Sequence, residues 1–363
     1  MRSTSPRPRG WCNLPPPSTD RHGSQVTTRI AVLGAGAFGT ALAIQLARRG
    51  NPTLLWGRDA EALTHMQEKC VNDRYLPGCP FPPALQMEAN LERAVRAADH
   101  ILVATPSHTL GGLLQTVAPL LRPNQGIACA CKGLEPETGH LPHEVIAEVL
   151  GSSHAFAVVS GPTFAKELGL GLPTAITVAS ADADFARIIA EALHGGGFRA
   201  YTTDDVIGVE IGGAAKNVLA IGIGIADGLG LGANTRAALI ARGLSELMRL
   251  AEALGARPET VMGLSGLGDV VLTCTDDQSR NRRMGLMVGR GTPAAEAIRA
   301  IGTVEGARAA PQVLRIARAH HIETPLIEQV TRVLRGEATP ADAVRALAMR
   351  PIKPERPVQE SAE

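Results

Sequence analysis

Residues 29–43 read Arg-Ile-Ala-Val-Leu-Gly-Ala-Gly-Ala-Phe-Gly-Thr-Ala-Leu-Ala, and this stretch decides the fold. An apolar run predicts a buried strand, and glycines lead from it directly into an apolar helix. Gly34 permits a tight turn, Gly36 lets the backbone approach a pyrophosphate, and Gly39 lets the helix pack closely on the strand. N–H groups at the helix start then face the anion. The pattern predicts a nicotinamide or flavin site, against the alternative of an ordinary glycine-rich loop.

The next strand narrows the choice of cofactor. Residues 52–56 are followed by Gly57, Arg58 and Asp59, about 20 positions after the last glycine of the turn, where the adenosine ribose is recognised. An acid there binds the 2′-hydroxyl of NAD, whereas an arginine pairs with the 2′-phosphate of NADP. Because both residues are present, we expect NADP or NAD as the cofactor. The alternative for either side chain is a solvated turn.

The order of elements predicts two domains. Between residue 29 and about residue 203, β-branched runs alternate with amphipathic helical patterns, which predicts an α/β, Rossmann-like, doubly wound parallel sheet. The later strands are expected at 101–104, 126–131, 155–159, 175–179 and 198–202. From about residue 205 only helical patterns follow, so the C-terminal domain should be all-α. A cleft between the two domains would hold the substrate.

We therefore divide the chain into four parts. An NAD(P)-binding domain is expected at 28–204 and an all-α substrate and catalytic domain at 205–350. The segments 1–27 and 351–363 are rich in Pro and charged residues, and we interpret them as a disordered extension and a disordered tail.

Composition excludes several classes of function. The net charge is +1 and aromatic residues make up 3% of the chain, which removes the case for a nucleic-acid partner. The six cysteines are scattered without zinc-ligand spacing, so we expect reduced thiols, no metal and a cytoplasmic protein. The apolar segment 218–232 is interrupted by Asp227. We therefore expect no membrane insertion.

Lys216 is the candidate catalytic base. It is the one lysine in the segment Val-Glu-Ile-Gly-Gly-Ala-Ala-Lys-Asn-Val-Leu-Ala at 209–220. Burial among small apolar residues would lower its pKa toward the range useful for a general base. Asn217 can hydrogen-bond a substrate oxygen. The alternative is a lysine that snorkels from a core helix to water.

A second cluster suggests a phosphate site. The polar, flexible stretch 264–274 leads to Ser279, Arg280 and Asn281, which open a predicted helix. Arg280 can clamp phosphate oxygens, and its two neighbours add hydrogen bonds near the positive helix end. Asp269 can partner Lys216, bind a substrate hydroxyl or cap a helix. A capped, solvated helix start is the alternative.

Two further segments follow strands of the first domain. Lys132, in Ala130-Cys-Lys-Gly-Leu-Glu, is expected at the carboxyl edge of the sheet near the nicotinamide. The segment Ser160-Gly-Pro-Thr-Phe-Ala-Lys-Glu offers hydroxyls and turn amides to phosphate or cofactor. A surface lysine and a plain strand-ending turn are the alternatives.

Taken together, these segments resemble the bacterial-type NAD(P)-dependent glycerol-3-phosphate dehydrogenases over residues 29–345. The resemblance rests on an ordered series of motifs. These are Gly34-Ala-Gly-Ala-Phe-Gly, Leu55-Trp-Gly-Arg-Asp, Asn72-Asp-Arg-Tyr-Leu-Pro-Gly, Pro106-Ser-His, Lys132-Gly-Leu-Glu, Ser160-Gly-Pro-Thr-Phe-Ala, Lys216-Asn, Ser265-Gly-Leu-Gly-Asp, Ser279-Arg-Asn and Val304-Glu-Gly.

The resemblance implies reversible hydride transfer between carbon 2 of sn-glycerol 3-phosphate and the nicotinamide, with dihydroxyacetone phosphate as the ketone. It also implies a homodimer and a role in phospholipid synthesis. Lys216 would be the proton acceptor, and Lys132 would contact both substrate and cofactor. The other implied substrate contacts are Gly161, Thr163, Asp269, Ser279, Arg280 and Asn281. The other implied cofactor contacts are Ala37, Phe38, Arg58, Ala165, Arg280, Thr303 and Glu305.

Two other hypotheses remain open. One is a related dehydrogenase of β-hydroxyacids or phosphosugars with the same two-domain build. The other is a catalytically silent NADPH-binding sensor or scaffold. The silent protein would be expected to lack the lysine or the phosphate cluster, and this chain has both.

Overall fold

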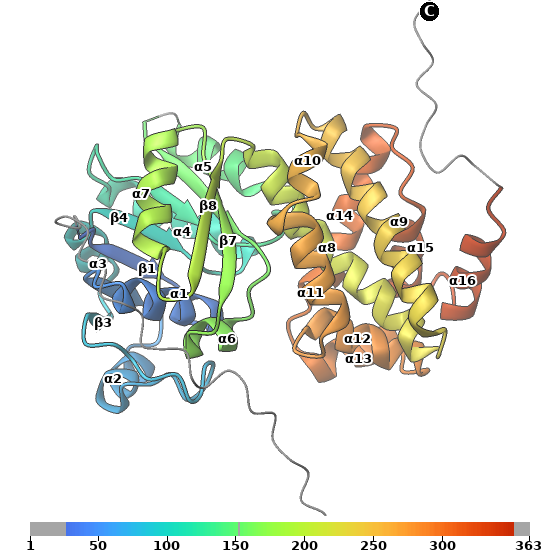
Figure 1. The fold of residues 1–363 in the computed structure, drawn as a ribbon, viewed down its shortest axis with the longest axis horizontal. Coiled ribbons are helices and arrows are strands. Elements are labelled where there is room, and N and C mark those ends of the chain that lie inside the picture. Colours follow the sequence, from blue (N-terminus) through green and yellow to red (C-terminus); the bar gives the residue numbers. More distant parts are fainter. Residues whose placement is uncertain (1–26, 152, 352–363) are drawn as a thin grey trace, which may run out of the picture.

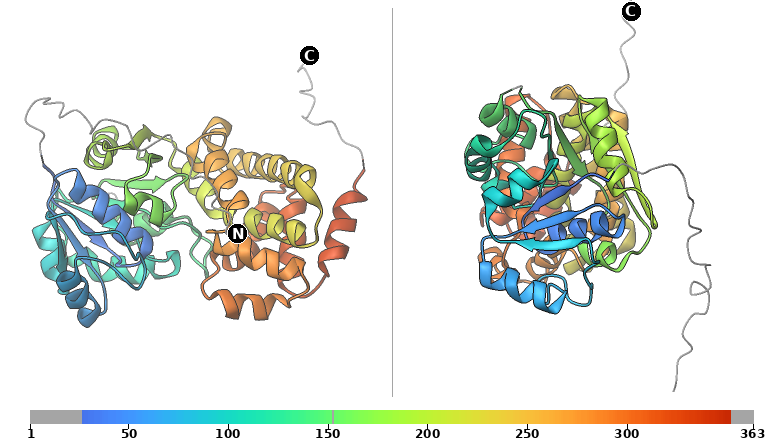
Figure 2. Two further views of the ribbon diagram at one scale, coloured as in Figure 1. Left: turned by 60° about the horizontal axis from the view of Figure 1, so that its bottom comes forward. Right: turned by 90° about the vertical axis from the view of Figure 1, so that its left-hand side faces the viewer.

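The computed structural model describes residues 27–151 and 153–351. The predicted disordered segments 1–27 and 351–363 therefore lie almost wholly outside the described residues. An α/β half and a helical half lie side by side (Figure 1, Figure 2). The last strand ends at Thr203 and the first long helix of the second half begins at Val206.

The first half is built on an eight-stranded sheet with the order β3-β2-β1-β4-β5-β6-β7-β8. All neighbouring strands are parallel except β6 and β7. This confirms the predicted Rossmann-like sheet. The strands are β1 (Ile30–Leu33), β2 (Thr53–Trp56), β3 (Leu85–Glu88), β4 (His100–Val103), β5 (Ile127–Cys129), β6 (Phe156–Ser160), β7 (Thr174–Ala179) and β8 (Phe198–Thr203).

Two details of the sheet differ from the sequence prediction. The strand β3 was not predicted, because its short pattern Leu-Gln-Met-Glu is only partly buried. The β6–β7 junction is antiparallel, whereas a wholly parallel sheet was expected. The connection between these two strands is the short helix α6 (Ala165–Leu170), and periodicity alone does not give the direction in which the chain returns.

Helices cover both faces of the sheet, so the central strands are apolar on both sides. Side chains of β1 alternate between the two cores, with Ile30 and Val32 in one and Ala31 and Leu33 in the other. The first core is closed by α1 and α7, and the second by α3, α4 and α5. The helices of this half are α1 (Ala37–Arg48), α2 (Ala60–Lys69), α3 (Leu91–Ala97), α4 (Leu110–Val117), α5 (Pro142–Leu150), α6 (Ala165–Leu170) and α7 (Ala183–Leu193).

The second half is helical, as predicted, and is organised around α8 (Val206–Gly228). Contrary to the expectation from the sequence, α8 is long and apolar enough to cross a membrane, but 94% of its apolar window is buried inside the protein. It is therefore a core helix. Around it lie α9 (Gly232–Ala253), α10 (Pro258–Val261), the π-helix at Leu264–Gly268, α11 (Asp269–Thr275), α12 (Arg280–Gly289), α13 (Ala294–Ile301), α14 (Glu305–Ala319), α15 (Pro325–Leu334) and α16 (Pro340–Ala348).

Glycines allow α8 and α12 to pack with their backbones nearly in contact. A Cβ atom added to Gly224 would lie 2.3 Å from the carbonyl oxygen of Arg282, and one added to Gly285 would lie 2.2 Å from that of Ile221. Real Cβ atoms do not approach a backbone oxygen this closely, so a larger residue would push the two helices apart. The glycines thus fix the separation of the two helices that carry Lys216 and Asn281.

We expect Gly285→Ala to destabilise the protein by about 1–3 kcal/mol, because the added methyl group overpacks a backbone contact. The free energy of unfolding in urea measures this loss. Gly112→Ala in α4 is the matched control: its Cβ would meet no atom within 4 Å, so it should be neutral or slightly stabilising. Equal stability of the two variants would contradict the packing argument.

Candidate active site

Lys216 lies on α8 and is buried, with 7% of its surface exposed. Its Nζ donates to Oδ1 of Asp269 at 2.6 Å and to Oγ1 of Thr273 at 3.1 Å. Both partners belong to α11. The side chain does not snorkel to water, so the alternative raised by the sequence does not hold.

Lys132 from the α/β half joins the same carboxylate. It follows β5 at the carboxyl edge of the sheet, as predicted, and its Nζ donates to Oδ2 of Asp269 at 2.7 Å and to the carbonyl oxygen of Gly161 at 3.0 Å. One buried carboxylate from the helical half therefore holds two ammonium groups, one from each half. Of the three roles considered for Asp269, the structure shows that of a partner for Lys216.

The charges of this cluster are strongly perturbed. Burial lowers the pKa of Lys216 to about 8, even though the neighbouring Asp269 opposes the shift. Burial alone would raise the pKa of Asp269, but Lys132 and Lys216 outweigh it and hold that pKa below its usual value. An amine with a pKa near 8 is suited to accept and return a proton near neutral pH. The lowering expected from the sequence is confirmed.

Amide side chains continue the cluster along α8. Asn281 Nδ2 donates to Oδ1 of Asn217 at 2.9 Å, and Asn217 Nδ2 donates to Oε2 of Glu305 at 3.3 Å. The Asn281 Oδ1 also accepts from the N–H of Gly306 at 2.9 Å. Three predicted functional residues from α8, α12 and α14 thus form one hydrogen-bonded set next to Lys216.

The turn after β1 fits a dinucleotide. A Cβ atom on Gly34, where φ is +127°, would lie 2.7 Å from the carbonyl oxygen of Ala104, so the turn itself requires glycine. Gly39 is equally constrained, since its Cβ would lie 1.9 Å from the carbonyl oxygen of Gly34.

Gly36 is different, because the protein does not require it to be glycine. It has an ordinary φ of −79°, and its Cβ would meet no atom within 4 Å. The turn is therefore open where a pyrophosphate would approach the first N–H groups of α1. Phe38 in this turn also reaches the lysine cluster, with Lys132 Nζ 5.6 Å from its ring centroid.

The two charged residues after β2 differ in their surroundings. Asp59 is the N-cap of α2, and its Oδ1 accepts from the N–H of Ala62 at 3.0 Å. Arg58 is exposed. Because Asp59 already satisfies a helix start, Arg58 is the better candidate for reading the ribose.

The segment 264–274 is more ordered than the sequence suggested. It forms the π-helix Leu264–Gly268 and then α11, not a flexible stretch. π-Helical turns are rare and are often found at functional sites, and this one precedes Asp269 directly. The helix predicted after Ser279 is confirmed as α12, with Ser279 Oγ accepting from the N–H of Arg282 at 3.2 Å. Arg280 is exposed at the helix start.

The remaining predicted residues lie around the same edge. Thr163 Oγ1 is 3.5 Å from the carbonyl oxygen of Ala175, and Ala165 begins α6. Thr303 is exposed and lines a pocket with residues of both halves. The pocket is lined by Pro106, Ser107, His108, Lys132, Gly133, Leu134, Pro136, Asn217, Thr303, Glu305, Arg308 and Ala309. The pocket therefore lies between the two halves, where a cleft was predicted, and Lys132 is the member of the lysine cluster that lines it.

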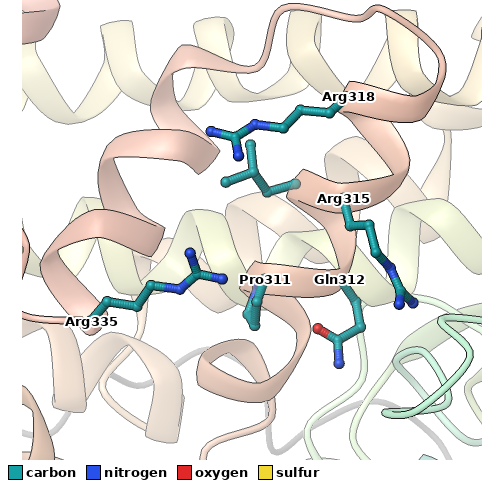
Figure 3. Close-up of a pocket in the computed structure, with 6 residues that line it drawn as sticks. Pro311, Gln312, Arg315, Arg318 and Arg335 are labelled. Atoms are coloured by element: carbon teal, nitrogen blue, oxygen red, sulfur yellow. The ribbon is translucent and has the colours of Figure 1, made fainter.

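A second hollow, of about 400 Å³, lies on the helical half and contains none of the predicted residues (Figure 3). Arg315, Arg318 and Arg335 line it together with Pro311, Gln312 and Leu314. Arg318 pairs with Glu328 at 2.9 Å, and Arg315 donates to the carbonyl oxygen of Thr138. Arg335 pairs with Glu337 at 3.7 Å, so all three arginines have partners, and no residue of the lysine cluster lines this hollow.

Sequence reasoning missed one member of the cluster. Thr273 accepts from Lys216 and lies 3.4 Å from Oδ1 of Asp269. It stands four residues after Asp269, so both side chains lie on one face of a helix. This signal was hidden because the segment was interpreted as flexible.

The Rossmann-like half, its open glycine turn and the buried lysine at the cleft define a two-domain nicotinamide-dependent dehydrogenase. Comparison with known proteins agrees. Residues 29–186 match the family model of the NAD-dependent glycerol-3-phosphate dehydrogenase N-terminus, and residues 205–345 match that of the C-terminus. The chain belongs to the NAD-dependent glycerol-3-phosphate dehydrogenase family.

Individual relatives cover nearly the whole chain. A glycerol-3-phosphate dehydrogenase [NAD(P)+] of Stenotrophomonas maltophilia is 54% identical over 335 residues, which cover 92% of this chain and 98% of the relative. A glycerol-3-phosphate dehydrogenase [NAD(P)+] of Xanthomonas campestris is 53% identical over 335 residues, which cover 92% of this chain and 98% of the relative. The crystal structure of a Coxiella burnetii glycerol-3-phosphate dehydrogenase has a TM-score of 0.85 at 46% identity and covers 89% of this chain and 99% of that one.

Proposed function

We propose that this chain catalyses reversible hydride transfer between carbon 2 of sn-glycerol 3-phosphate and NAD(P), with Lys216 as the catalytic base. Family membership supports the reaction, and the buried Lys216–Asp269–Lys132 cluster at the cleft supports the assignment of the base. When bound, the nicotinamide supplies or accepts the hydride at its carbon 4. The chain's own residues supply the proton chemistry, the substrate site and the exclusion of water.

In alcohol oxidation, neutral Lys216 removes the proton of the carbon 2 hydroxyl while the hydride leaves. In ketone reduction, the protonated amine returns that proton to the carbonyl oxygen. The pKa of about 8 keeps both forms accessible near neutral pH. Asp269 orients the amine, and Thr273, on the same face of α11, accepts a second hydrogen bond from it.

Lys132 is proposed to contact both substrate and cofactor. Its ammonium group lies between Asp269, the Gly161 carbonyl and the ring of Phe38. A cation at this place stabilises negative charge that develops on the carbon 2 oxygen. Gly161 and Thr163 would then border the substrate on the β6 side.

The start of α12 is proposed to bind the phosphate. Arg280 supplies a planar pair of hydrogen-bond donors. The positive end of the helix dipole, at the N-terminus of α12, also favours an anion. Asn281 is fixed by Asn217 and by the N–H of Gly306, so its position relative to Lys216 is set before substrate arrives. Ser279, which caps the helix, holds this geometry and lies next to the phosphate.

Cofactor binding is assigned to the glycine turn and the edge around it. The proposed contacts are Gly34, Gly36, Ala37, Phe38, Gly39, Arg58, Lys132, Ala165, Arg280, Thr303 and Glu305. Gly36 carries most of this assignment, because no atom of the described residues lies within 4 Å of the position its Cβ would take.

Several broader assignments belong to the same proposal. The reduction direction would supply glycerol 3-phosphate for phospholipid synthesis in the cytoplasm, and the enzyme would be a homodimer without membrane insertion. The domain boundaries proposed from the sequence, 28–204 and 205–350, are supported by the end of β8 at Thr203 and the start of α8 at Val206.

The direct test is to mix purified protein with dihydroxyacetone phosphate and NADPH or NADH. The loss of absorbance of the reduced cofactor measures its consumption. We expect steady-state reduction and formation of glycerol 3-phosphate. A related phosphosugar or β-hydroxyacid dehydrogenase would instead prefer another member of a substrate panel. Cofactor binding without turnover of any substrate would favour the silent sensor and overturn the proposal.

Lys216→Ala should lower kcat by roughly 100-fold or more, because a positioned base is lost, while NADPH still binds. In the unsubstituted enzyme the oxidation rate should rise with pH through about 8, since only the neutral amine accepts the proton. Asp269→Asn should move this midpoint lower, because the carboxylate stabilises the ammonium form. A pH profile unchanged by Lys216→Ala would assign the base elsewhere.

Arg58→Ala should raise the KM for NADPH by roughly 10-fold and leave the KM for NADH nearly unchanged, because only NADPH carries the 2′-phosphate that a guanidinium would pair. Steady-state kinetics with both cofactors measure the difference. Arg74→Ala, another exposed arginine of this half, is the control. Equal effects of Arg58→Ala on both cofactors would refute the role.

A further inference from the structure

Ser160 is a buried serine whose hydroxyl is unpaired. It is the last residue of β6 and is 2% exposed. Its Oγ has no hydrogen-bond partner within residues 27–151 and 153–351. Burying an unpaired hydroxyl costs free energy, so a serine at this place calls for a function that alanine would not serve.

The hydroxyl faces α8 beside the lysine cluster. Alternate residues of β6 point to α8: Val158 packs with Val209, and Ser160 is the next residue on that face. A Cβ atom on Gly213, one helical turn after Val209, would lie 3.0 Å from Ser160 Oγ and 3.8 Å from Cγ of Lys132. Ser160 Oγ and the stem of Lys132 therefore both face Gly213, a helix position without a side chain.

Functional groups follow one another along α8 in a definite order. Ser160 Oγ lies at Gly213, the Lys216 amine starts three residues later, and Asn217 is bonded to Asn281 at the start of α12. At 1.5 Å per residue, this series extends over about 6 Å along the helix. The order is hydroxyl, amine, then the amide beside the arginine.

A triose phosphate carries its groups in a matching order. Its terminal hydroxyl lies at one end, the reacting carbon 2 in the middle and the phosphate at the other end. With carbon 2 at Lys216 and the phosphate at α12, the terminal hydroxyl is directed toward Ser160. Because Ser160 Oγ is uncharged, it suits the neutral terminal hydroxyl of the substrate. The phosphate, in contrast, pairs with cations.

We propose that Ser160 Oγ hydrogen-bonds the terminal hydroxyl of the substrate and so determines specificity for it. This inference rests on the proposed function. It predicts that the enzyme discriminates between dihydroxyacetone phosphate and acetol phosphate, which differs only in carrying a methyl group in place of the hydroxymethyl group.

The test compares both ketones with the unsubstituted enzyme and with Ser160→Ala. We expect Ser160→Ala to lower kcat/KM for dihydroxyacetone phosphate by about 10-fold, the size of one hydrogen bond, and to leave that for acetol phosphate within twofold. If acetol phosphate turns over too slowly, its inhibition constant replaces kcat/KM. The pH midpoint set by Lys216 should not move.

Ser180→Ala is the matched control, since Ser180 follows the neighbouring strand β7 and is also 2% exposed. Its Oγ is paired, donating to the Phe156 carbonyl at 2.5 Å and accepting from the Asp182 N–H at 3.1 Å. Ser180→Ala should lower the melting temperature without changing substrate preference. Ser160→Ala should leave the melting temperature unchanged or raise it, because no protein bond is lost.

Equal losses with both ketones would overturn the inference, because Ser160 would then act on the lysines or on packing alone. No change with either ketone would overturn it as well. Failure of the unsubstituted enzyme to reduce dihydroxyacetone phosphate would instead remove the proposed function, and the inference with it. A failure of the proposed function is seen in the unsubstituted enzyme, whereas a failure of the inference is seen only when Ser160→Ala is compared with it.

Discussion

One carboxylate shared by two buried ammonium groups is the interaction on which the site depends. Asp269 accepts from Lys216 at 2.6 Å and from Lys132 at 2.7 Å. These lysines come from opposite halves of the molecule, so the ion pairs fix both halves around one point. Buried charges of this kind are retained at a cost in desolvation. Their position at the edge where the parallel strands end gives a functional reason for that cost.

The charge balance of this cluster also suits an anionic substrate. Two ammonium groups and one carboxylate leave one unit of positive charge in a buried setting, where electrostatic interactions are stronger than in water. Arrival of a phosphate at α12 adds negative charge nearby and favours the protonated form of Lys216. Substrate binding and the protonation state of the base are therefore coupled by the same electrostatic field.

The sequence predicted those parts of the molecule that depend on local pattern. The glycine turn at 29–43, the change from strands to helices near residue 205 and the buried environment of Lys216 all follow from spacing and composition. The direction of β7 and the π-helix at Leu264–Gly268 did not, because both depend on contacts between segments distant in sequence. Thr273 was missed for a different reason: its place on the same face as Asp269 appears only once α11 is known to be helical. The unpaired state of Ser160 Oγ likewise needs coordinates, since the sequence shows only a serine at a strand end.

The geometry of the site can be traced back to glycines that bring backbones together. Gly224 and Gly285 set the distance between α8 and α12, and this distance places Asn281 against Asn217. Gly213 and Gly212 act in the same way on other sides of α8, where a Cβ would meet Ser160 Oγ at 3.0 Å and the Ser265 carbonyl oxygen at 2.6 Å. A helix with larger residues at these positions would stand farther from β6, from the π-helix and from α12. The small residues of α8 therefore help to set the positions from which Lys216 and Asn217 meet their partners.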